Sequence, residues 1–239
     1  ILRDITKQKS LEDERDEFIS VVSHELRTPI AIAEGSLSNV QLMMERPDIP
    51  QTTLHDGVNA AHQQVVFLAK MANDLSTLSR AERGVADTPE LIDVAELISE
   101  LYAEYSPEAT EKSLYFDLDL DPQLGAVNES RLYLKELLQN IVTNAIKYTQ
   151  TGGVTVSVKR SAPRLLTFTV KDTGIGISRS DQQHLFQKFW RSEDYRTRET
   201  GGTGLGLYVA HKLAKKLNTT IELKSRLNPG STFSFSLPS

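Results

Sequence analysis

The sequence predicts a multidomain α and α+β protein, in which an antiparallel helical hairpin dimerises into a four-helix bundle and is followed by an α/β sandwich domain. Two observations predict this arrangement. Apolar residues recur every three or four positions through residues 11–79, which is typical of long helices that pack side by side. From residue 93 onward, short segments of alternating polarity are interleaved with amphipathic segments, as in a mixed sheet covered by helices on one face.

The composition favours a globular, cytoplasmic segment. A hydrophobic content of 39% in 239 residues is enough for at least one core, and the net charge of −5 predicts no nucleic-acid partner. The absence of cysteine excludes disulfides, thiolate metal sites and cysteine nucleophiles. No apolar stretch approaches the roughly 20 residues of a membrane span, and the start lacks a signal-peptide pattern, so we expect no membrane contact in this segment. Because the chain does not begin with methionine, we expect it to be part of a longer protein.

Two helices form the predicted hairpin, and Pro47 and Pro50 turn the chain back between them. In the first helix, within residues 11–46, the apolar stripe consists of Phe18, Val22, Leu26, Ile30, Ala33, Leu37 and Val40. In the second, within residues 54–79, it consists of Leu54, Val58, Ala61, Val65, Leu68, Ala72, Leu75 and Ser79. Each stripe is wider than one partner helix covers, so we expect two hairpins to associate as a homodimer.

The second domain, expected at residues 93–239, follows a predicted linker at 85–92 that ends the hairpin domain of residues 11–84. Its predicted helices span residues 95–105, 132–148, 178–186 and 204–217. Its predicted strands span residues 114–120, 154–159, 165–172, 219–224 and 232–237. Because these elements alternate without a strict βαβ order, they indicate a sandwich of helices on a mixed sheet.

A carboxylate is predicted to point inward at the end of the strand 165–172. The alternation of apolar residues along this strand places Asp172 on the buried face. An inward carboxylate needs a hydrogen-bond donor, and Gly174 and Gly176 allow another group to approach closely. A strand-end aspartate followed by glycines also commonly forms a plain turn, so this motif alone leaves a binding site and a turn open.

A polar stripe of Asn140, Asn144 and Lys147 lies on the predicted helix 132–148. Asparagine is a mediocre helix former, so two on one stripe invite a functional explanation. The amide oxygen of Asn144 suits a hard cation such as Mg²⁺, and Lys147 suits a phosphate. The alternative is a solvated helix face.

A glycine-rich loop, GGTGLG at residues 201–206, precedes the last predicted helix. The amides and the positive end of that helix favour an anion in the loop. The polar stretch before it, residues 187–203, is long for a connection and almost free of aliphatic residues. We interpret it as a lid over bound phosphates.

Five segments resemble the motif boxes of bacterial two-component sensor histidine kinases, in the family's order and over nearly the whole chain. They are FISVVSHELRTPI for the H box, LLQNIVTNAIKYT for the N box, VKDTGIGIS for the G1 box, LFQKFWR for the F box and GGTGLGL for the G2 box. The resemblance implies a dimerisation and phosphoacceptor hairpin followed by an ATP-binding domain of the Bergerat fold. Residues 1–10 also resemble the tail of a PAS sensor domain.

The resemblance further implies the parts of an ATP site. Asp172 would bind the adenine amino group, Asn144 would bind Mg²⁺, and Asn140 would help to build the metal and phosphate site. The remaining residues implied in ATP binding are Lys147, Tyr148, Gly174, Gly176, Arg191, Gly202, Thr203, Gly204, Leu205 and Gly206.

His24 is predicted to point away from the hairpin's apolar stripe and into water. Imidazole is a competent nucleophile at neutral pH, and one exposed on a rigid helix can be visited by an ATP-binding domain. Glu25 is about 100° further around the helix, so it must fold back to hold one ring N–H and stabilise the imidazolium. Pro29 weakens the helix just past this pair. These features predict a phosphoacceptor His24 with Glu25 as its catalytic partner.

The resemblance implies a kinase that uses ATP and Mg²⁺ to phosphorylate its own His24 and passes the phosphoryl group to an aspartate of a response regulator receiver domain. The segment HELRT also resembles the family's phosphatase pattern, in which Thr28 positions a water. One alternative is an ATPase clamp of the same fold, which is disfavoured because Asn140 stands where those enzymes carry a water-activating glutamate. The other alternative is a pseudokinase scaffold.

Overall fold

The computed structural model describes residues 6–46, 48–83, 88–192, 194 and 201–239, with side chains from residue 16 onward except at residue 17. The chain forms two compact units, Ile1–Asn73 and Asp74–Ser239, which divide inside the second helix. Residues 1–5, half of the stretch that resembles a PAS tail, lie outside the described residues. In the described part of the chain, none of the helices combines the length and apolar content needed to span a bilayer.

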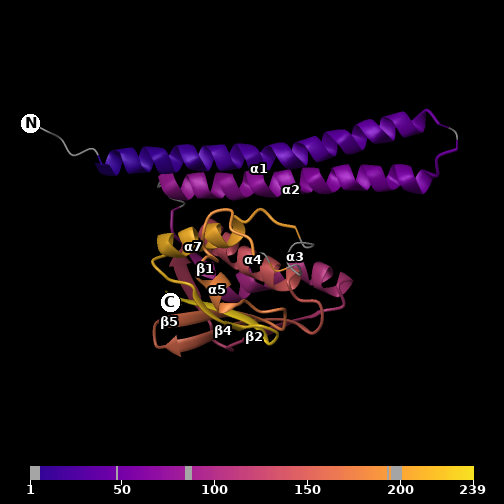
Figure 1. Cartoon of the computed structure of the whole chain (residues 1–239). Helices are drawn as coiled ribbons and strands as arrows, with labels where there is room; N and C mark the ends of the chain where they lie inside the picture. The colour runs from indigo at the N-terminus through magenta and orange to yellow at the C-terminus, as the bar shows by residue number, and fades with distance from the viewer. Residues whose placement is uncertain (1–5, 47, 84–87, 193, 195–200) are drawn as a thin grey trace, which may run out of the picture. The chain divides into compact units, whose positions relative to one another are not determined.

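The predicted helical hairpin is confirmed. Helix α1 (Thr6–Met44) and helix α2 (Gln51–Arg83) run antiparallel over much of their length (Figure 1). The two helices approach closely where Gly57 faces Val40, because a Cβ added at Gly57 would lie 2.5 Å from the Val40 Cγ2 atom. Helix α1 continues through Pro29, whose ring is buried.

Only part of each predicted apolar stripe is buried within one chain. Ala33, Val40 and Ala61 are buried. The stripe residues that remain about half exposed are Ile30, Leu37, Val58 and Val65. Because a helix in a hairpin has only one neighbour from its own chain, the rest of its stripe stays uncovered.

The second unit is built on a five-stranded sheet in the order β2-β4-β5-β7-β6. The strands are β2 (Tyr115–Leu120), β4 (Gly153–Ala162), β5 (Leu165–Asp172), β6 (Glu222–Arg226) and β7 (Gly230–Pro238). Strands β2 and β4 are parallel, and the other neighbours are antiparallel. This is the mixed sheet that the sequence predicts.

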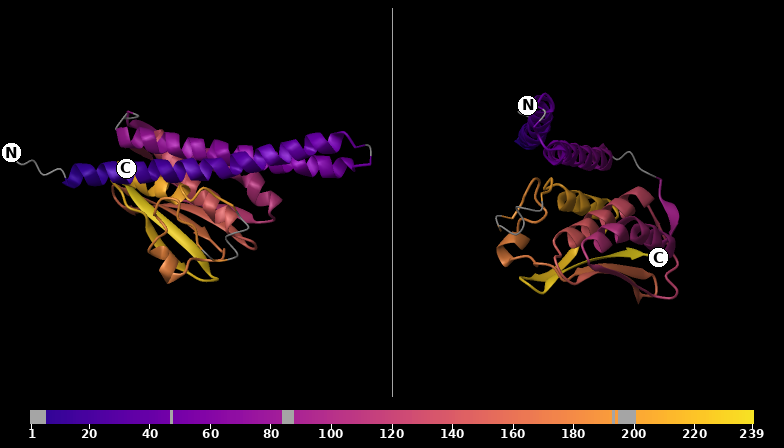
Figure 2. Two further views of the ribbon diagram at one scale, coloured as in Figure 1. Left: turned by 45° about the horizontal axis from the view of Figure 1, so that its top comes forward. Right: turned by 90° about the vertical axis from the view of Figure 1, so that its right-hand side faces the viewer.

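Three helices cover one face of this sheet (Figures 1 and 2). They are α3 (Val94–Glu111), α4 (Arg131–Lys147) and α7 (Gly206–Lys216). Helix α4 packs against both α3 and α7 and against strands β4 and β5. The inward side chains of the strands form the core beneath the helices, where the rings of Phe168 and Phe235 stack with centroids 5.0 Å apart.

Several predicted boundaries and elements differ from the structure. A second, two-stranded sheet pairs β1 (Glu90–Asp93) with β3 (Ala126–Glu129), although residues 90–92 were expected in the linker. Helix α3 runs through Pro107 to Glu111, six residues beyond its predicted end, since Ala109 is buried in the core. Helix α5 (Arg179–Gln182) is shorter than predicted, and Ser178 caps its start, because the Ser178 hydroxyl accepts a hydrogen bond from Asp181 N.

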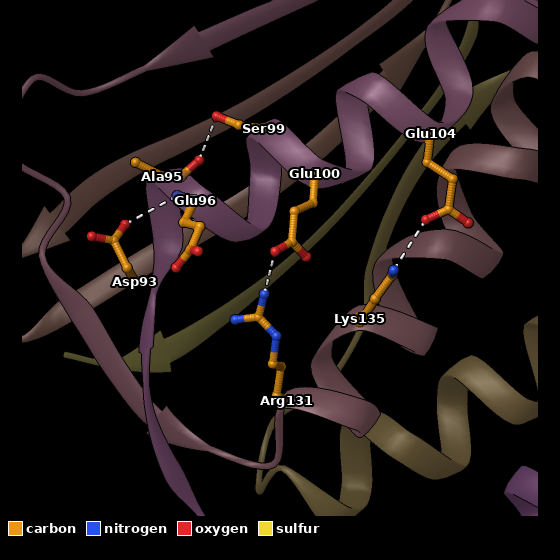
Figure 3. A network of polar contacts seen from close by, with 8 residues as sticks. All are labelled: Asp93, Ala95, Glu96, Ser99, Glu100, Glu104, Arg131 and Lys135. Carbon is orange, nitrogen blue, oxygen red and sulfur yellow. Dashed lines mark hydrogen bonds and ion pairs between the residues drawn. The ribbon is translucent and has the colours of Figure 1, made fainter.

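Polar contacts between α3 and α4 orient the helix that carries the asparagine stripe (Figure 3). Arg131 pairs with Glu100 at 2.6 Å, and Lys135 pairs with Glu104 at 3.1 Å. Asp93 caps the start of α3 by accepting a hydrogen bond of 3.0 Å from Glu96 N. The ion-paired side chains are partly exposed, so each pair adds little to the stability of α4.

Candidate functional site

Asp172 lies buried at the end of β5, on the inward face that the strand alternation predicts. Its Oδ1 atom accepts hydrogen bonds from Gly174 N at 2.8 Å and from Ser231 N at 3.1 Å. Burial raises the pKa of this carboxyl group, and the two backbone hydrogen bonds partly oppose the rise. Two amides thus hold one carboxylate oxygen in place, and the other oxygen can accept from an amino group.

The second of these donors comes from a part of the chain that sequence reasoning missed. Gly230 and Ser231 open β7, which pairs with β5 far away in sequence. Gly230 has a φ of 91°, and a Cβ there would lie 2.0 Å from the backbone oxygen of Asp172, so only glycine fits this position. The only local signal is the Pro-Gly pair at residues 229–230, which indicates a turn and not a binding site.

Asn140 is buried on α4, which excludes the solvated-face interpretation for this residue. Its Nδ2 atom donates to the backbone oxygen of Glu136 at 2.9 Å. Its Oδ1 atom faces the start of α7, because a Cβ added at Gly206 would lie 2.7 Å from it. Asn144, one turn later, is half-buried on the same helix. The predicted stripe therefore lies against the glycine-rich loop and the helix that follows it.

Lys147 completes the stripe and contacts the loop directly. Its Nζ atom donates hydrogen bonds to the Gly201 carbonyl oxygen and, at 3.1 Å, to the Tyr148 hydroxyl group. The same ammonium group lies 4.7 Å from the centroid of the Tyr148 ring. These contacts bring Lys147 and Tyr148, at the end of α4, together with the glycine loop, although Lys147 and Gly201 are 54 positions apart in the sequence.

The glycine loop leads into α7, whose N-terminus carries the partial positive charge of the helix. Leu205 occupies the N-cap position without a side-chain cap, and Thr203 and Leu205 are buried. Gly204 has a φ of 67° and packs against the backbone of Phe189, where a Cβ would lie 2.7 Å from the nearest atom. Backbone amides at this helix start suit a phosphate group.

The predicted lid lies partly outside the described residues, which lack residues 193 and 195–200. Arg191, at its start, is exposed. Two histidines of the second unit stack on aromatic residues: His184 lies 6.3 Å from Trp190, and His211 lies 5.0 Å from Phe186, between ring centroids. Burial, with smaller contributions from the charges of neighbouring lysines, lowers the pKa of His211. Both histidines thus have packing contacts, as expected for structural residues.

His24 is exposed on α1, as predicted, with 75% of its side chain accessible. The Glu25 Oε1 atom lies 3.7 Å from His24 Nδ1, so the carboxylate does turn toward the ring. This separation is within ion-pair range but longer than a hydrogen bond. Thr28, one turn further on, is also exposed. The arrangement presents a nucleophile, a proton acceptor and a hydroxyl group on one stretch of α1.

The donor set of the second unit fits a nucleotide and a hard cation. The described residues contain no group of three or more histidine, cysteine or acidic side chains that could hold a metal by themselves. The amide oxygens of Asn140 and Asn144 are hard ligands of the kind that Mg²⁺ takes together with phosphate oxygens and water. The buried Asp172, the asparagines, Lys147 and the start of α7 therefore form a candidate site for a nucleoside polyphosphate.

Comparison with known families agrees with this division. Residues 14–84 match the family model described as the His Kinase A (phospho-acceptor) domain. Residues 129–239 match the family model described as the histidine kinase-, DNA gyrase B- and HSP90-like ATPase. The first match contains His24, Glu25 and Thr28, and the second contains Asn140, Asn144, Lys147, Asp172 and the glycine loop.

Known proteins extend the likeness to nearly the whole chain. The sensor histidine kinase RppB of Synechocystis sp. is 33% identical over 230 residues, which are 94% of this chain and 49% of RppB. The chain thus spans about half the length of RppB, and it spans 37% and 39% of the length of two further curated relatives. The structure of the Acinetobacter baumannii histidine kinase AdeS superposes with a TM-score of 0.69 at 27% identity, covering 90% of this chain and 97% of AdeS. The histidine kinase ThkA, in complex with the response regulator protein TrrA, shares the fold with a TM-score of 0.67 at 21% identity, over 98% of this chain and 65% of ThkA.

Proposed function

The chain belongs to the two-component sensor histidine kinases, and from this premise we propose that it transfers the γ-phosphoryl group of ATP to His24 and then to an aspartate of a response regulator. The observation that carries the proposal is the exposed His24 with Glu25 turned toward its ring, in a chain that also contains an ATPase domain. ThkA, which has the same fold, was crystallised with a response regulator, and this supports the choice of partner.

The nucleotide is bound through its two ends. The free oxygen of Asp172 accepts a hydrogen bond from the adenine amino group, while Gly174 N and Ser231 N hold the other oxygen. Tyr148 borders the nucleotide, and the amides of the glycine loop and of the start of α7 bind the phosphates. Lys147 exchanges the Gly201 carbonyl for a phosphate oxygen when ATP binds, and Arg191 approaches the phosphates from the lid.

Asn144 and Asn140 are the residues that would hold a magnesium ion, through their amide oxygens. When bound, Mg²⁺ would neutralise charge on the phosphate oxygens. The chain itself orients the amide oxygen of Asn140. The Nδ2 atom of Asn140 donates a hydrogen bond to the Glu136 carbonyl oxygen, so the Oδ1 atom faces the start of α7.

His24 acts as the nucleophile in the tautomer that carries its proton on Nδ1. The Nε2 lone pair forms the N–P bond, the bond from the γ-phosphorus to the bridging oxygen breaks, and ADP leaves with that electron pair. Glu25 accepts the Nδ1 proton, since the developing positive charge on the ring draws its carboxylate in from 3.7 Å. In the second step the phosphoryl group passes from His24 to a receiver-domain aspartate.

We also propose that Thr28 serves a phosphatase activity of the same chain toward the phosphorylated regulator. Its hydroxyl group is exposed one turn from His24, where it can position a water molecule. The Thr28→Ala variant is expected to keep autophosphorylation and to lose nucleotide-dependent dephosphorylation of the regulator. Intact dephosphorylation by this variant would remove Thr28 from the proposal.

Incubation with γ-labelled ATP and Mg²⁺ tests the kinase proposal. Wild type is expected to acquire a label that is labile in acid and stable in alkali, and His24→Ala and Asn144→Ala are expected to acquire none. His55→Ala is the matched control, because His55 is likewise exposed on the hairpin. Label that survives in His24→Ala would contradict the assignment. Steady ATP turnover without a phosphoprotein would indicate an ATPase instead, and failure to bind ATP would indicate a scaffold.

A further inference from the structure

A buried carboxylate outside the motif boxes contacts the glycine loop. Asp74, the first residue of the second unit, lies on α2 with 4% of its surface exposed. The Thr203 hydroxyl, in a residue that is 5% exposed, donates a hydrogen bond of 3.0 Å to Asp74 Oδ2. Burying an ionisable group is costly unless it is hydrogen-bonded. The hydrogen bond from Thr203 therefore helps to offset the cost of burying Asp74 in the second unit.

The direction of this hydrogen bond is determined by its neighbours. The Thr203 Oγ1 atom also accepts a hydrogen bond of 3.2 Å from Leu205 N. A hydroxyl group has a single proton and a backbone N–H can only donate, so the proton of Thr203 goes to the carboxylate. Asp74 thereby turns the lone pair of Thr203 toward Leu205, at the N-cap of α7. A chain of two hydrogen bonds links the carboxylate to the start of the helix.

Thr203 is the only residue in the segment 201–204 that has a side chain. The glycines around it have left-handed backbone conformations, with φ of 143° at Gly202 and 67° at Gly204. A glycine-rich loop loses much conformational entropy when it is held in one shape, so a single anchored side chain has a large influence on it. On the other side, the loop contacts Lys147 through the Gly201 carbonyl.

We propose that Asp74 is a positioning residue of the nucleotide site, which acts through Thr203 to hold the glycine loop and the start of α7 in the shape that binds phosphates. The inference rests on the proposed function, because it takes this loop to be the phosphate site. Asp172, which binds the base, has its own partners in Gly174 and Ser231. Loss of Asp74 therefore weakens phosphate binding and leaves base binding intact.

Calorimetric titration of the whole chain with ATP and Mg²⁺, and separately with adenosine, tests the inference. Asp74→Ala and Thr203→Val are each expected to weaken ATP binding about tenfold, which corresponds to about 1.4 kcal/mol, with adenosine binding unchanged. The double variant is expected to be no weaker than either single one, because both remove the same hydrogen bond. Asp74→Asn retains a hydrogen-bond acceptor, and Thr203→Ser retains a hydroxyl group. Each of these two variants is therefore expected to bind ATP as tightly as wild type.

The matched control is Thr77→Val, which changes another buried residue on the same end of α2 and is expected to leave ATP binding unchanged. Equal losses of ATP and adenosine binding in Asp74→Ala would overturn the inference, since they would indicate a general loss of structure. Unchanged ATP binding in Asp74→Ala and Thr203→Val would also overturn it, whatever their rate of autophosphorylation. If wild type itself failed to bind ATP, the proposed function would be refuted first, and this inference with it.

Discussion

At the residue scale, Asp172 combines an unfavourable buried charge with the base-binding role that we propose for it. Burial raises the pKa of its carboxyl group, so the folded chain favours the protonated form more than the unfolded chain does. The adenine recognition that we propose for Asp172 needs the ionised form, since the carboxylate must accept hydrogen bonds from the two backbone amides and from the base. The residue therefore costs stability at neutral pH in exchange for binding specificity.

We expect Asp172→Asn to increase the free energy of unfolding at pH 8 and to weaken ATP binding by at least tenfold. The amide removes a buried charge, but it presents an NH₂ group to the adenine amino group and loses a charge-assisted hydrogen bond. Because burial raises the pKa of Asp172 in the folded chain, this group destabilises the fold only at pH values where it ionises. The gain in the free energy of unfolding should therefore vanish below about pH 4, where the carboxyl group is protonated in both the folded and the unfolded chain. Thermal unfolding across this pH range measures the effect. A gain of equal size at pH 3 would contradict the assigned cause.

Glu25 is the second residue whose proposed catalytic role can be tested separately from its contribution to stability. Its side chain is 43% exposed and its carboxylate lies 3.7 Å from His24 Nδ1, so it adds little to stability. We expect Glu25→Gln to slow autophosphorylation about a hundredfold or more, as is typical for loss of a general base, with ATP binding unchanged. Single-turnover labelling measures this rate. Glu34→Gln, an exposed glutamate on the same helix, should label at the wild-type rate.

At the element scale, α4 is the helix that organises the site, because it carries the asparagines and Lys147 and packs between α3 and α7. Its start is held by the buried Ser130, whose hydroxyl group accepts a hydrogen bond of 3.2 Å from Tyr133 N. The side chains of the two ion pairs to α3 (Figure 3) are partly exposed, between 33% and 42%. The cap and the core packing therefore contribute more to the stability of α4 than the ion pairs do.

We expect Ser130→Ala to lower the free energy of unfolding by about 1 kcal/mol, because it leaves a helix-start amide without its acceptor. Arg131→Ala, which removes the neighbouring ion pair to Glu100, is the comparison and should cost less than about 1 kcal/mol, with an effect that shrinks at high salt. Urea titration at low and high salt measures both. A larger loss in Arg131→Ala than in Ser130→Ala would reverse this ranking.

At the scale of the whole molecule, the hairpin leaves apolar side chains uncovered. Ile30, Leu37, Val58 and Val65 belong to the predicted stripes, and between 46% and 54% of each remains exposed in one chain. Two helices offer each other only one face, and a second hairpin of the same sequence presents a matching set. We propose that these residues form the core of a homodimeric four-helix bundle.

We expect Val65→Glu to convert this dimer to monomers, since a charge in the bundle core cannot be solvated. ATP binding should be unchanged, because the nucleotide site lies in the second unit. Sedimentation equilibrium measures the mass. Gln63→Glu adds the same charge at a neighbouring exposed polar position and should leave the dimer intact. A wild-type chain that sediments as a monomer would refute the proposed bundle.

Local pattern predicted most of the fold and several site residues. The strand at residues 165–172 and the inward Asp172 follow from alternation alone, and the structure has both. The strands β1 and β3 were missed, because four-residue strands carry too few residues to show a period. The apolar stripe of α2 was predicted without its division into a buried part and an exposed part, since a helical period does not say which neighbour covers each residue.

The sequence by itself determined the hairpin, the mixed sheet, the exposed His24 and the residue types that suit a nucleotide, because each depends on periodicity or on chemistry within a short stretch. Only the tertiary structure decided which distant residues complete the site. Ser231 N reaches Asp172 because β7 pairs with β5, and Asp74 reaches Thr203 because the end of α2 packs within the second unit. Such partners are 59 and 129 positions apart, and no local pattern encodes a hydrogen bond between groups that only folding brings within 3 Å or so of each other.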